Sequence, residues 1–218
     1  MPEVAKDRKT APSGSTECPL LAESRHSFKG IRMRILAFAG SVREESFNKK
    51  LVRLAAKAAE EVGAEVTLID LRDFPMPLMD QDLEEREGIP KHGKRFKALL
   101  REHQGWLIAA PEYNSGITPL LKNAIDWASR AESKDEETLS VYKGKTAAIM
   151  SASPGGFGGA RGLVQVRSIL SNIKVTVLDD ELTIPKAFKA FDDVGQLTDP
   201  DQVASLQKLV QSLVATLQ

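Results

Sequence analysis

The strongest constraint on the fold is an alternation of two patterns that begins at Arg34 and continues through the rest of the chain. Short apolar runs of strand length alternate with segments whose apolar residues recur at helical spacing. The runs cover residues 35–39, 65–71, 105–110, 145–152 and 174–178. This alternation predicts an α/β fold, a doubly wound parallel sheet of five strands with helices on both faces. Both common strand orders, Rossmann-like and flavodoxin-like, satisfy the pattern.

Helix starts are marked by capping residues as well as by spacing. Ser46, Thr118 and Asp199 are positioned to cap helices that begin at residues 47, 119 and 200. Further helices are predicted over residues 91–103 and after the glycine-rich residues 155–159. Residues 74–90 contain three prolines and a charge run. They predict a long surface loop, with residues 80–87 as a solvated acidic face.

Charge and cysteine content exclude several classes of protein. The chain has 30 Lys+Arg and 30 Asp+Glu, so the net charge gives no electrostatic reason to expect a nucleic-acid partner. Its one cysteine, Cys18, excludes an intrachain disulfide framework and a cysteine-rich metal site. No apolar run approaches the roughly 20 residues needed to span a bilayer. We therefore expect a cytoplasmic protein with no membrane partner and no metal.

The first 32 residues differ from the rest of the chain. They show no apolar periodicity and are rich in Pro, Ser, Lys and Glu. They also lack the apolar stretch of a signal peptide. This composition predicts a flexible tail over residues 1–32, followed by a single domain over residues 33–218.

In either strand order, ligands bind beyond the carboxyl ends of the strands, where the order reverses. The first such segment, "GSVREESFN", joins a strand to a helix. It offers the short polar side chains of Ser41, Ser46 and Asn48 and the guanidinium of Arg43. A helix N-terminus favours an anion, and arginine can bond a phosphate bidentately. The segment predicts a phosphate site, although an ordinary capped turn between strand and helix has a similar composition.

The kind of phosphate can be narrowed from the motifs that the chain lacks. Nothing matches the Walker A pattern G-x-x-x-x-G-K-[ST]. The one G-x-G begins at Gly156, and Arg161 occupies the place of its third glycine. A loop lined by side chains therefore favours a monophosphate over a diphosphate.

The second segment, "PEYNSGITPLLKNAIDW", begins with a proline that stiffens the exit from the third strand. A planar heterocycle needs a flat wall and main-chain hydrogen-bonding groups along its polar edge, and a Pro-x-Tyr-Asn turn can provide both. The alternatives are a half-buried packing role for Tyr113 and, for Glu112, a carboxylate that accepts hydrogen bonds from nearby N–H groups. We favour this last role for Glu112 over acid–base catalysis. The candidate residues here are Pro111, Glu112, Tyr113, Asn114, Ser115 and Gly116.

The third segment, "SASPGGFGGARG", has four glycines in five positions. Glycine costs conformational entropy on folding, so this density indicates that the backbone approaches something closely. Backbone N–H groups there could reach the carbonyl edge of a ring. A flexible loop at a subunit contact is the alternative, and the two are compatible.

Together, and in this order, the three segments are similar to those of the NADPH-dependent FMN reductase family, which includes soluble quinone, azo-dye and chromate reductases. The resemblance extends from about Arg34 to Gln218. It implies a flavodoxin-like sheet of order 2-1-3-4-5, bound FMN, and NADPH or NADH as co-substrate. It also implies a small electron acceptor such as a quinone, azo dye, chromate, ferric chelate or free flavin, and a homodimer or homotetramer.

The resemblance also assigns residues, and it places the redox chemistry on FMN rather than on a catalytic side chain. Ser41, Arg43, Ser46 and Asn48 match residues that hold the FMN phosphate. Residues 111–116 match the turn that lines the isoalloxazine ring. Ser151, Ser153, Gly155 and Gly156 match the loop at the other edge of the ring.

Two non-enzymatic functions are alternatives. A flavodoxin-type electron carrier would pass electrons to a protein partner without using NAD(P)H, and a flavin-binding sensor would use flavin for signalling. Flavodoxins are usually strongly acidic and hold the phosphate without arginine. The balanced charge and Arg43 therefore disfavour the carrier.

Overall fold

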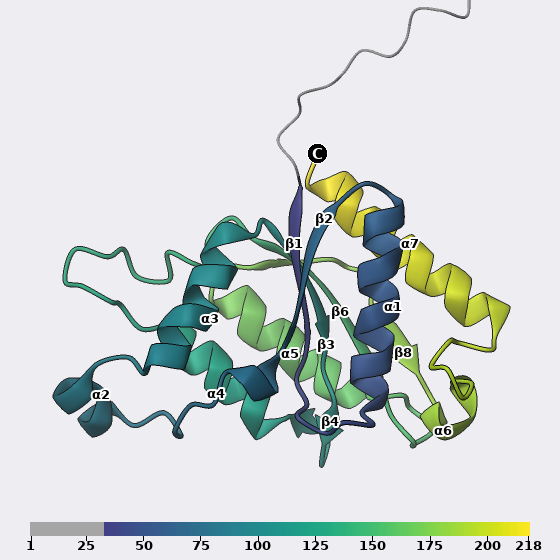
Figure 1. Ribbon diagram of the computed structural model, residues 1–218, viewed down its shortest axis with the longest axis horizontal. Coiled ribbons are helices and arrows are strands. Elements are labelled where there is room, and N and C mark those ends of the chain that lie inside the picture. Colours follow the sequence, from purple (N-terminus) through teal and green to yellow (C-terminus); the bar gives the residue numbers. More distant parts are fainter. Residues whose placement is uncertain (1–32) are drawn as a thin grey trace, which may run out of the picture. The chain divides into compact units, whose positions relative to one another are not determined.

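The computed structural model describes residues 33–218, in which a parallel sheet lies between two layers of helices (Figure 1). The predicted tail over residues 1–32 lies outside the described residues. The long strands are β1 (Arg34–Ala39), β2 (Glu65–Asp70), β3 (Gly105–Ala109) and β6 (Thr146–Ala152). Their order is β2-β1-β3-β6-β7, all parallel. The flavodoxin-like order 2-1-3-4-5 is confirmed.

The strand at the fifth position of the sheet is shorter than the predicted strand over residues 174–178. Only β7 (Thr176–Val177) pairs there as a strand, opposite the beginning of β6. A further strand, β8 (Leu182–Ile184), pairs with the end of β6. The charged residues Asp179, Asp180 and Glu181 separate the two. One edge of the sheet is therefore made of two short strands rather than one continuous run over residues 174–178.

Each face of the sheet is covered by its own helices. Helices α1 (Phe47–Glu61) and α7 (Pro200–Thr216) cover one face. Helices α3 (Lys91–Glu102), α4 (Pro119–Ala128) and α5 (Ala160–Asn172) cover the other (Figure 1). Successive strand residues point to opposite faces, so β1 serves both cores. Ile35, Ala37 and Ala39 belong to the core under α1 and α7, and Leu36 and Phe38 to the other.

The capping predictions have mixed outcomes. The Thr118 side chain accepts a hydrogen bond from the Leu121 N–H, and Asp199 accepts one from the Asp201 N–H. Both caps are confirmed. Ser46 occupies the cap position of α1, but its side chain makes no capping hydrogen bond. The beginning of α1 therefore keeps N–H groups that no side chain caps.

The prediction of an unbroken loop over residues 74–90 is wrong, because the segment contains α2 (Gln81–Glu87). Asp80 begins this helix by accepting hydrogen bonds from the N–H groups of Asp82 and Leu83, and Gly88 ends it with a φ of 74°. No residue of α2 is buried, which agrees with the predicted solvated face, but Glu84 is an exception because it pairs with Arg130 at 2.8 Å. Short elements elsewhere are a 3₁₀ turn (Leu71–Asp73), a hairpin of β4 (Glu112–Tyr113) and β5 (Gly116–Ile117), and α6 (Ala187–Ala190).

A buried lysine fixes the connection between α4 and β6. The Lys97 side chain is only 2% exposed, and its Nζ lies 2.7 Å from Glu136 Oε2 and 3.7 Å from Glu132 Oε1. It also donates to the Arg130 carbonyl. Burial would raise the pKa of Glu136, but hydrogen bonds from the Glu132 N–H, Lys97 and Ser140 lower it to about 2.

We expect Glu136→Gln to lower the free energy of unfolding by about 3 kcal/mol near neutral pH, because it removes the nearest anion from a buried ammonium group. The pKa of Glu136 lies below its unfolded value, so its contribution is present above pH 4.5 and is lost as the pH falls toward 2. Urea unfolding of both proteins between pH 7 and pH 3 should show the difference shrinking below pH 4.5. Glu137→Gln, which removes a carboxylate paired with the exposed Lys143, is the control and should have little effect. A deficit in Glu136→Gln that does not change with pH would contradict this account.

Candidate functional site

The register of the sheet brings the three candidate segments to one edge. Ala39, at the end of β1, pairs with Asp70 of β2 and Ala109 of β3, and Ala109 in turn pairs with Met150 of β6. The segments that follow β1, β3 and β6 therefore leave the sheet side by side. They surround a cavity of about 100 Å³. Its lining residues are Ser41, Arg43, Ser46, Phe47, Asn48, Pro111, Glu112, Tyr113, Ala152, Ser153 and Pro154.

The cavity unites predicted residues from all three segments, but some predicted residues lie outside its wall. Asn114, Ser115 and Gly116 form the tip of the β4–β5 hairpin, where Asn114 and Ser115 have φ values of 50° and 65°. Ser151 is fully buried at the end of β6. Gly155 and Gly156 follow the wall residue Pro154 directly. The assignment of all these residues to the flavin ring stays a prediction.

The first segment combines unused hydrogen-bond donors with an unpaired cation. Ser41 and Ser46 are buried beside the beginning of α1, which has no side-chain cap and no acidic residue in its first turn. Arg43 is exposed, and within the described residues its guanidinium has no hydrogen-bond or ion-pair partner. These features fit an anion such as a phosphate monoester.

Arg72, which the sequence analysis missed, holds this segment from outside. Its guanidinium lies 2.9 Å from Glu44 Oε1 and also donates to the Val42 carbonyl. Arg72 comes from the 3₁₀ turn after β2. Glu44 is the immediate neighbour of Arg43, and it pairs with Arg72 rather than with Arg43. Only the spatial proximity of residues 42–44 and 72 reveals this role.

Asn48 joins the first segment to the third. Its Nδ2 donates to the Ala152 carbonyl at 2.8 Å, and its Oδ1 accepts from the Ala152 N–H at 3.0 Å. Both residues are buried. Asn48 was predicted to contact phosphate, a role that stays a prediction. Its geometry assigns it a positioning role: it fixes the start of α1 against the end of β6.

Glu112 joins the second segment to the helix after the third. Its Oε2 accepts a hydrogen bond from the Gly162 N–H at 3.0 Å, in the first turn of α5. A Cβ at Gly162 would lie only 3.2 Å from the Cβ of Glu112, so glycine permits this approach. Gln165 adds contacts from α5 to Ile117 and Ser115 of the hairpin. Glu112 was expected to bond N–H groups near it in its turn; it accepts a main-chain hydrogen bond, but the donor belongs to α5.

A third contact links the first and second segments. Thr118 Oγ1 donates to the Gly40 carbonyl at 2.9 Å while it caps α4. The φ of Gly40 is not in the left-handed range, so its conformation does not by itself require glycine. A Cβ there would lie 3.0 Å from Leu121 and 3.3 Å from Pro111. Glycine is needed because the two segments pack closely.

The glycines of the third segment fall into two groups. A Cβ at Gly158 would lie 2.8 Å from the Pro185 nitrogen, and one at Gly159 would lie 2.0 Å from Ser151 Oγ. These two glycines allow the chain to approach itself. A Cβ at Gly155 would meet only Ser153 Oγ at 3.6 Å, and one at Gly156 would meet nothing within 4 Å. Gly155 and Gly156 therefore leave open space beside the cavity wall.

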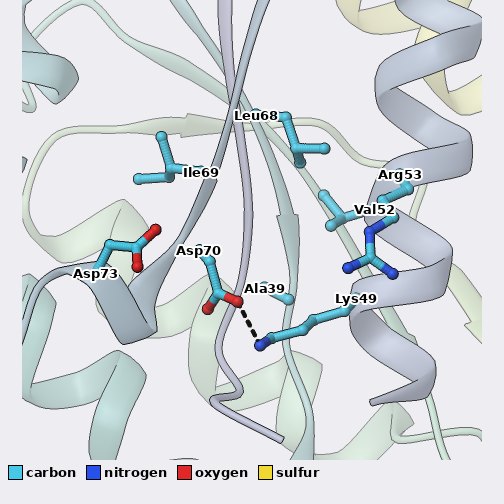
Figure 2. A pocket seen from close by; sticks show the side chains of 8 residues that line it. All are labelled: Ala39, Lys49, Val52, Arg53, Leu68, Ile69, Asp70 and Asp73. Atoms are coloured by element: carbon cyan, nitrogen blue, oxygen red, sulfur yellow. Dashed lines mark hydrogen bonds and ion pairs between the residues drawn. The ribbon is translucent and has the colours of Figure 1, made fainter. Parts of the chain in front are cut away.

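A different cavity, of about 270 Å³, lies between α1 and the edge strand β2 (Figure 2). Lys49 and Arg53 reach it from α1, and Lys49 Nζ pairs with Asp70 Oδ2 at 2.5 Å. Burial would raise the pKa of Asp70, but hydrogen bonds from Lys49 and the Arg72 N–H outweigh it and lower the pKa. The pairing neutralises a lysine in the first turn of α1. None of the predicted site residues lines this cavity.

Comparisons with known proteins agree with this geometry. The family model described as NADPH-dependent FMN reductase matches residues 33–189. The chain belongs to the NADPH-dependent FMN reductase family. Its members are oxidoreductases, and the expectation of FMN and NADPH agrees with the family's description.

Individual relatives match most of the chain. A probable NADPH:quinone oxidoreductase of Oryza sativa is 34% identical over 188 residues, which cover 84% of this chain and 88% of the relative. An NAD(P)H-dependent FMN reductase of Pseudomonas aeruginosa is 34% identical over 182 residues, 83% of this chain and 93% of that protein. The structure of FerB, a flavoenzyme NAD(P)H:(acceptor) oxidoreductase from Paracoccus denitrificans, has a TM-score of 0.72 at 27% identity and covers 85% of this chain and 97% of its own.

We expect Asn48→Ala to destabilise the protein by about 2–3 kcal/mol, because it leaves the buried N–H and C=O of Ala152 without partners. Ser46→Ala is the matched control, two residues away and also buried. It should lower the free energy of unfolding by less than about 0.5 kcal/mol. This is below the usual effect of removing a helix-capping side chain, because Ser46 makes no capping hydrogen bond. Urea unfolding at neutral pH measures both. Equal losses in the two variants would show that Asn48 is not the tie between α1 and β6.

Proposed function

We propose that the protein is an FMN-containing NAD(P)H oxidoreductase that reduces a small acceptor, with quinones as the favoured class. The observation that carries the proposal is the start of α1, at the cavity where three loops meet. It combines backbone N–H groups that no side chain caps, two buried serines and an arginine without a partner among residues 33–218. Relatives named quinone oxidoreductases or quinone reductases support the choice of acceptor.

The phosphate end of FMN is assigned to the first segment. Ser41 and Ser46 would donate hydroxyl hydrogen bonds, and Arg43 would pair with the phosphate charge. Asn48 and Arg72 hold the segment from either side and so keep it in place before FMN binds. A site that is already ordered loses less entropy on binding.

The flavin ring is assigned to the space between the second and third segments. Pro111 and Tyr113 line the cavity from one side, and Ser153 and Pro154 from the other. Tyr113 is 53% exposed, which leaves its ring available to a planar ligand. Main-chain groups of residues 112–116 and 153–156 would meet the polar edge of the ring. When bound, FMN supplies the hydride and electron transfer chemistry, and the protein supplies orientation and shielding.

The acceptor would enter where the site is open to solvent. Azo dyes, chromate, ferric chelates and free flavin are further acceptors that a reduced flavin at such an opening could serve. No helix among residues 33–218 is long and apolar enough to cross a membrane. We place the protein in the cytoplasm as a homodimer or homotetramer, and sedimentation of the purified protein tests the assembly.

An absorbance spectrum of the purified protein, followed by anaerobic titration with NADPH, tests the proposed function. Flavin bands that bleach with NADPH and return on addition of a quinone are expected. Flavin bands that NADPH leaves unchanged would indicate an electron carrier or a sensor. A colourless protein that does not take up added FMN would overturn the proposal.

We expect Arg43→Ala to weaken FMN binding by about 1.5–3 kcal/mol, the range for a hydrogen bond to a charged group. Riboflavin has no phosphate, so its affinity should change little. Fluorescence titration of the apoprotein with each flavin measures both. Arg53→Ala is the control. It removes another exposed cation of α1, one that does not line this cavity, and the affinity for both flavins should not change. An equal loss for FMN and riboflavin in Arg43→Ala would exclude the phosphate role.

A further inference from the structure

The glycine-rich segment and the segment after β8 form one surface next to the proposed flavin site. Ser153 N–H donates to the Ile184 carbonyl at 3.1 Å, and Ala187 N–H donates to the Ser153 carbonyl at 3.0 Å. Lys186 N–H donates to the Gly155 carbonyl at 3.1 Å. The first of these segments begins in the cavity wall at Ser153 and Pro154. The two segments are therefore adjacent to each other and to the cavity wall.

This surface, which we call the basic face, exposes two aromatic rings and three cations. Phe157 is 65% exposed and Phe188 is 57% exposed. The exposed cations are Arg161, Lys186 and Lys189. None of the three has an ion-pair partner within residues 33–218, where the structure is described. Residues 151–162 and 182–190 contain no Asp or Glu, so the side-chain charges that these two segments themselves contribute are all positive.

Arg161 is held in place by a ring rather than by a carboxylate. Its Cζ lies 4.5 Å from the centre of the Phe157 ring, a cation–π contact. This contact restricts the side chain while leaving its N–H groups free. The N-terminus of α5 is already occupied by the Glu112 carboxylate. Anion binding at the basic face must therefore come from the side chains.

We propose that the basic face binds the adenosine-phosphate half of NAD(P)H, and that Arg161 contacts the 2′-phosphate that distinguishes NADPH from NADH. The inference rests on the proposed function, because the nicotinamide must reach the flavin in the cavity. The rest of the nucleotide then extends past the cavity wall. It carries several negative charges and an adenine ring, which complement a face of cations and exposed phenylalanines. Arginine suits a phosphate dianion because its fork can bond two oxygens.

Steady-state kinetics of the FMN-loaded enzyme test the proposal. Arg161→Gln should raise the KM for NADPH at least fivefold, change the KM for NADH less than twofold, and leave kcat within twofold. Arg161→Lys should recover part of the loss, because it restores the charge without the fork. Lys57→Gln removes an exposed cation on α1, far from the basic face in sequence and outside the cavity lining, and should change nothing. Unchanged KM values for both nucleotides in Arg161→Gln would overturn the proposal while leaving the oxidoreductase function intact.

Calorimetry provides a readout that does not depend on turnover. Adenosine 2′,5′-bisphosphate should bind the FMN-loaded wild-type protein more tightly than adenosine 5′-monophosphate does. Arg161→Gln should remove this difference. Lys186→Asn, at a second position of the basic face, should weaken both ligands. If the bisphosphate shows no preference over the monophosphate in wild type, the proposal is wrong even if NADPH is oxidised.

Sedimentation separates the nucleotide role from a subunit contact. The oligomeric state of Arg161→Gln should match that of the wild type. A changed state together with unchanged nucleotide binding would assign the basic face to contact between copies of the chain, and would overturn the proposal.

Discussion

The geometry of the site depends on the pair of hydrogen bonds between Asn48 and Ala152. One residue of α1 donates to and accepts from the main chain at the end of β6, and both partners are buried. Two further contacts complete the set: Thr118 bonds to the Gly40 carbonyl, and Glu112 bonds to the Gly162 N–H. Each pair of segments is thus joined by a specific polar contact. The cavity between them is fixed by the fold rather than by the ligand.

Charge pairing around the first segment leaves one cation free. Glu44 pairs with Arg72 and Asp70 pairs with Lys49, so these two carboxylates are each matched by a cation other than Arg43. The Arg43 guanidinium has no hydrogen-bond or ion-pair partner in the described part of the chain. An exposed arginine beside uncapped helix N–H groups creates a local positive potential in a chain whose net charge is zero. The overall charge balance therefore says little about what the site binds.

Much of the fold could be predicted from the sequence because the central strands are buried on both faces and appear as continuous apolar runs. The split edge strand could not, because β7 and β8 have two and three residues, too few for a periodic pattern. Helix α2 was missed although Asp80 and Gly88 mark its ends, because the prolines before it favoured a loop. The sequence also indicated which segments meet at the site. It could not indicate the Asn48–Ala152 and Arg72–Glu44 contacts, because the partners are far apart along the chain and no local pattern links them.

A crystal structure of the FMN-loaded protein tests the central claim most directly. The account predicts phosphate oxygens within hydrogen-bonding distance of the Arg43 guanidinium, the Ser41 and Ser46 hydroxyls and the first N–H groups of α1. It also predicts that the Asn48–Ala152 bonds remain as they are without FMN. A phosphate bound at the glycine-rich segment, or a first segment that moves away from β6 when FMN binds, would contradict the account.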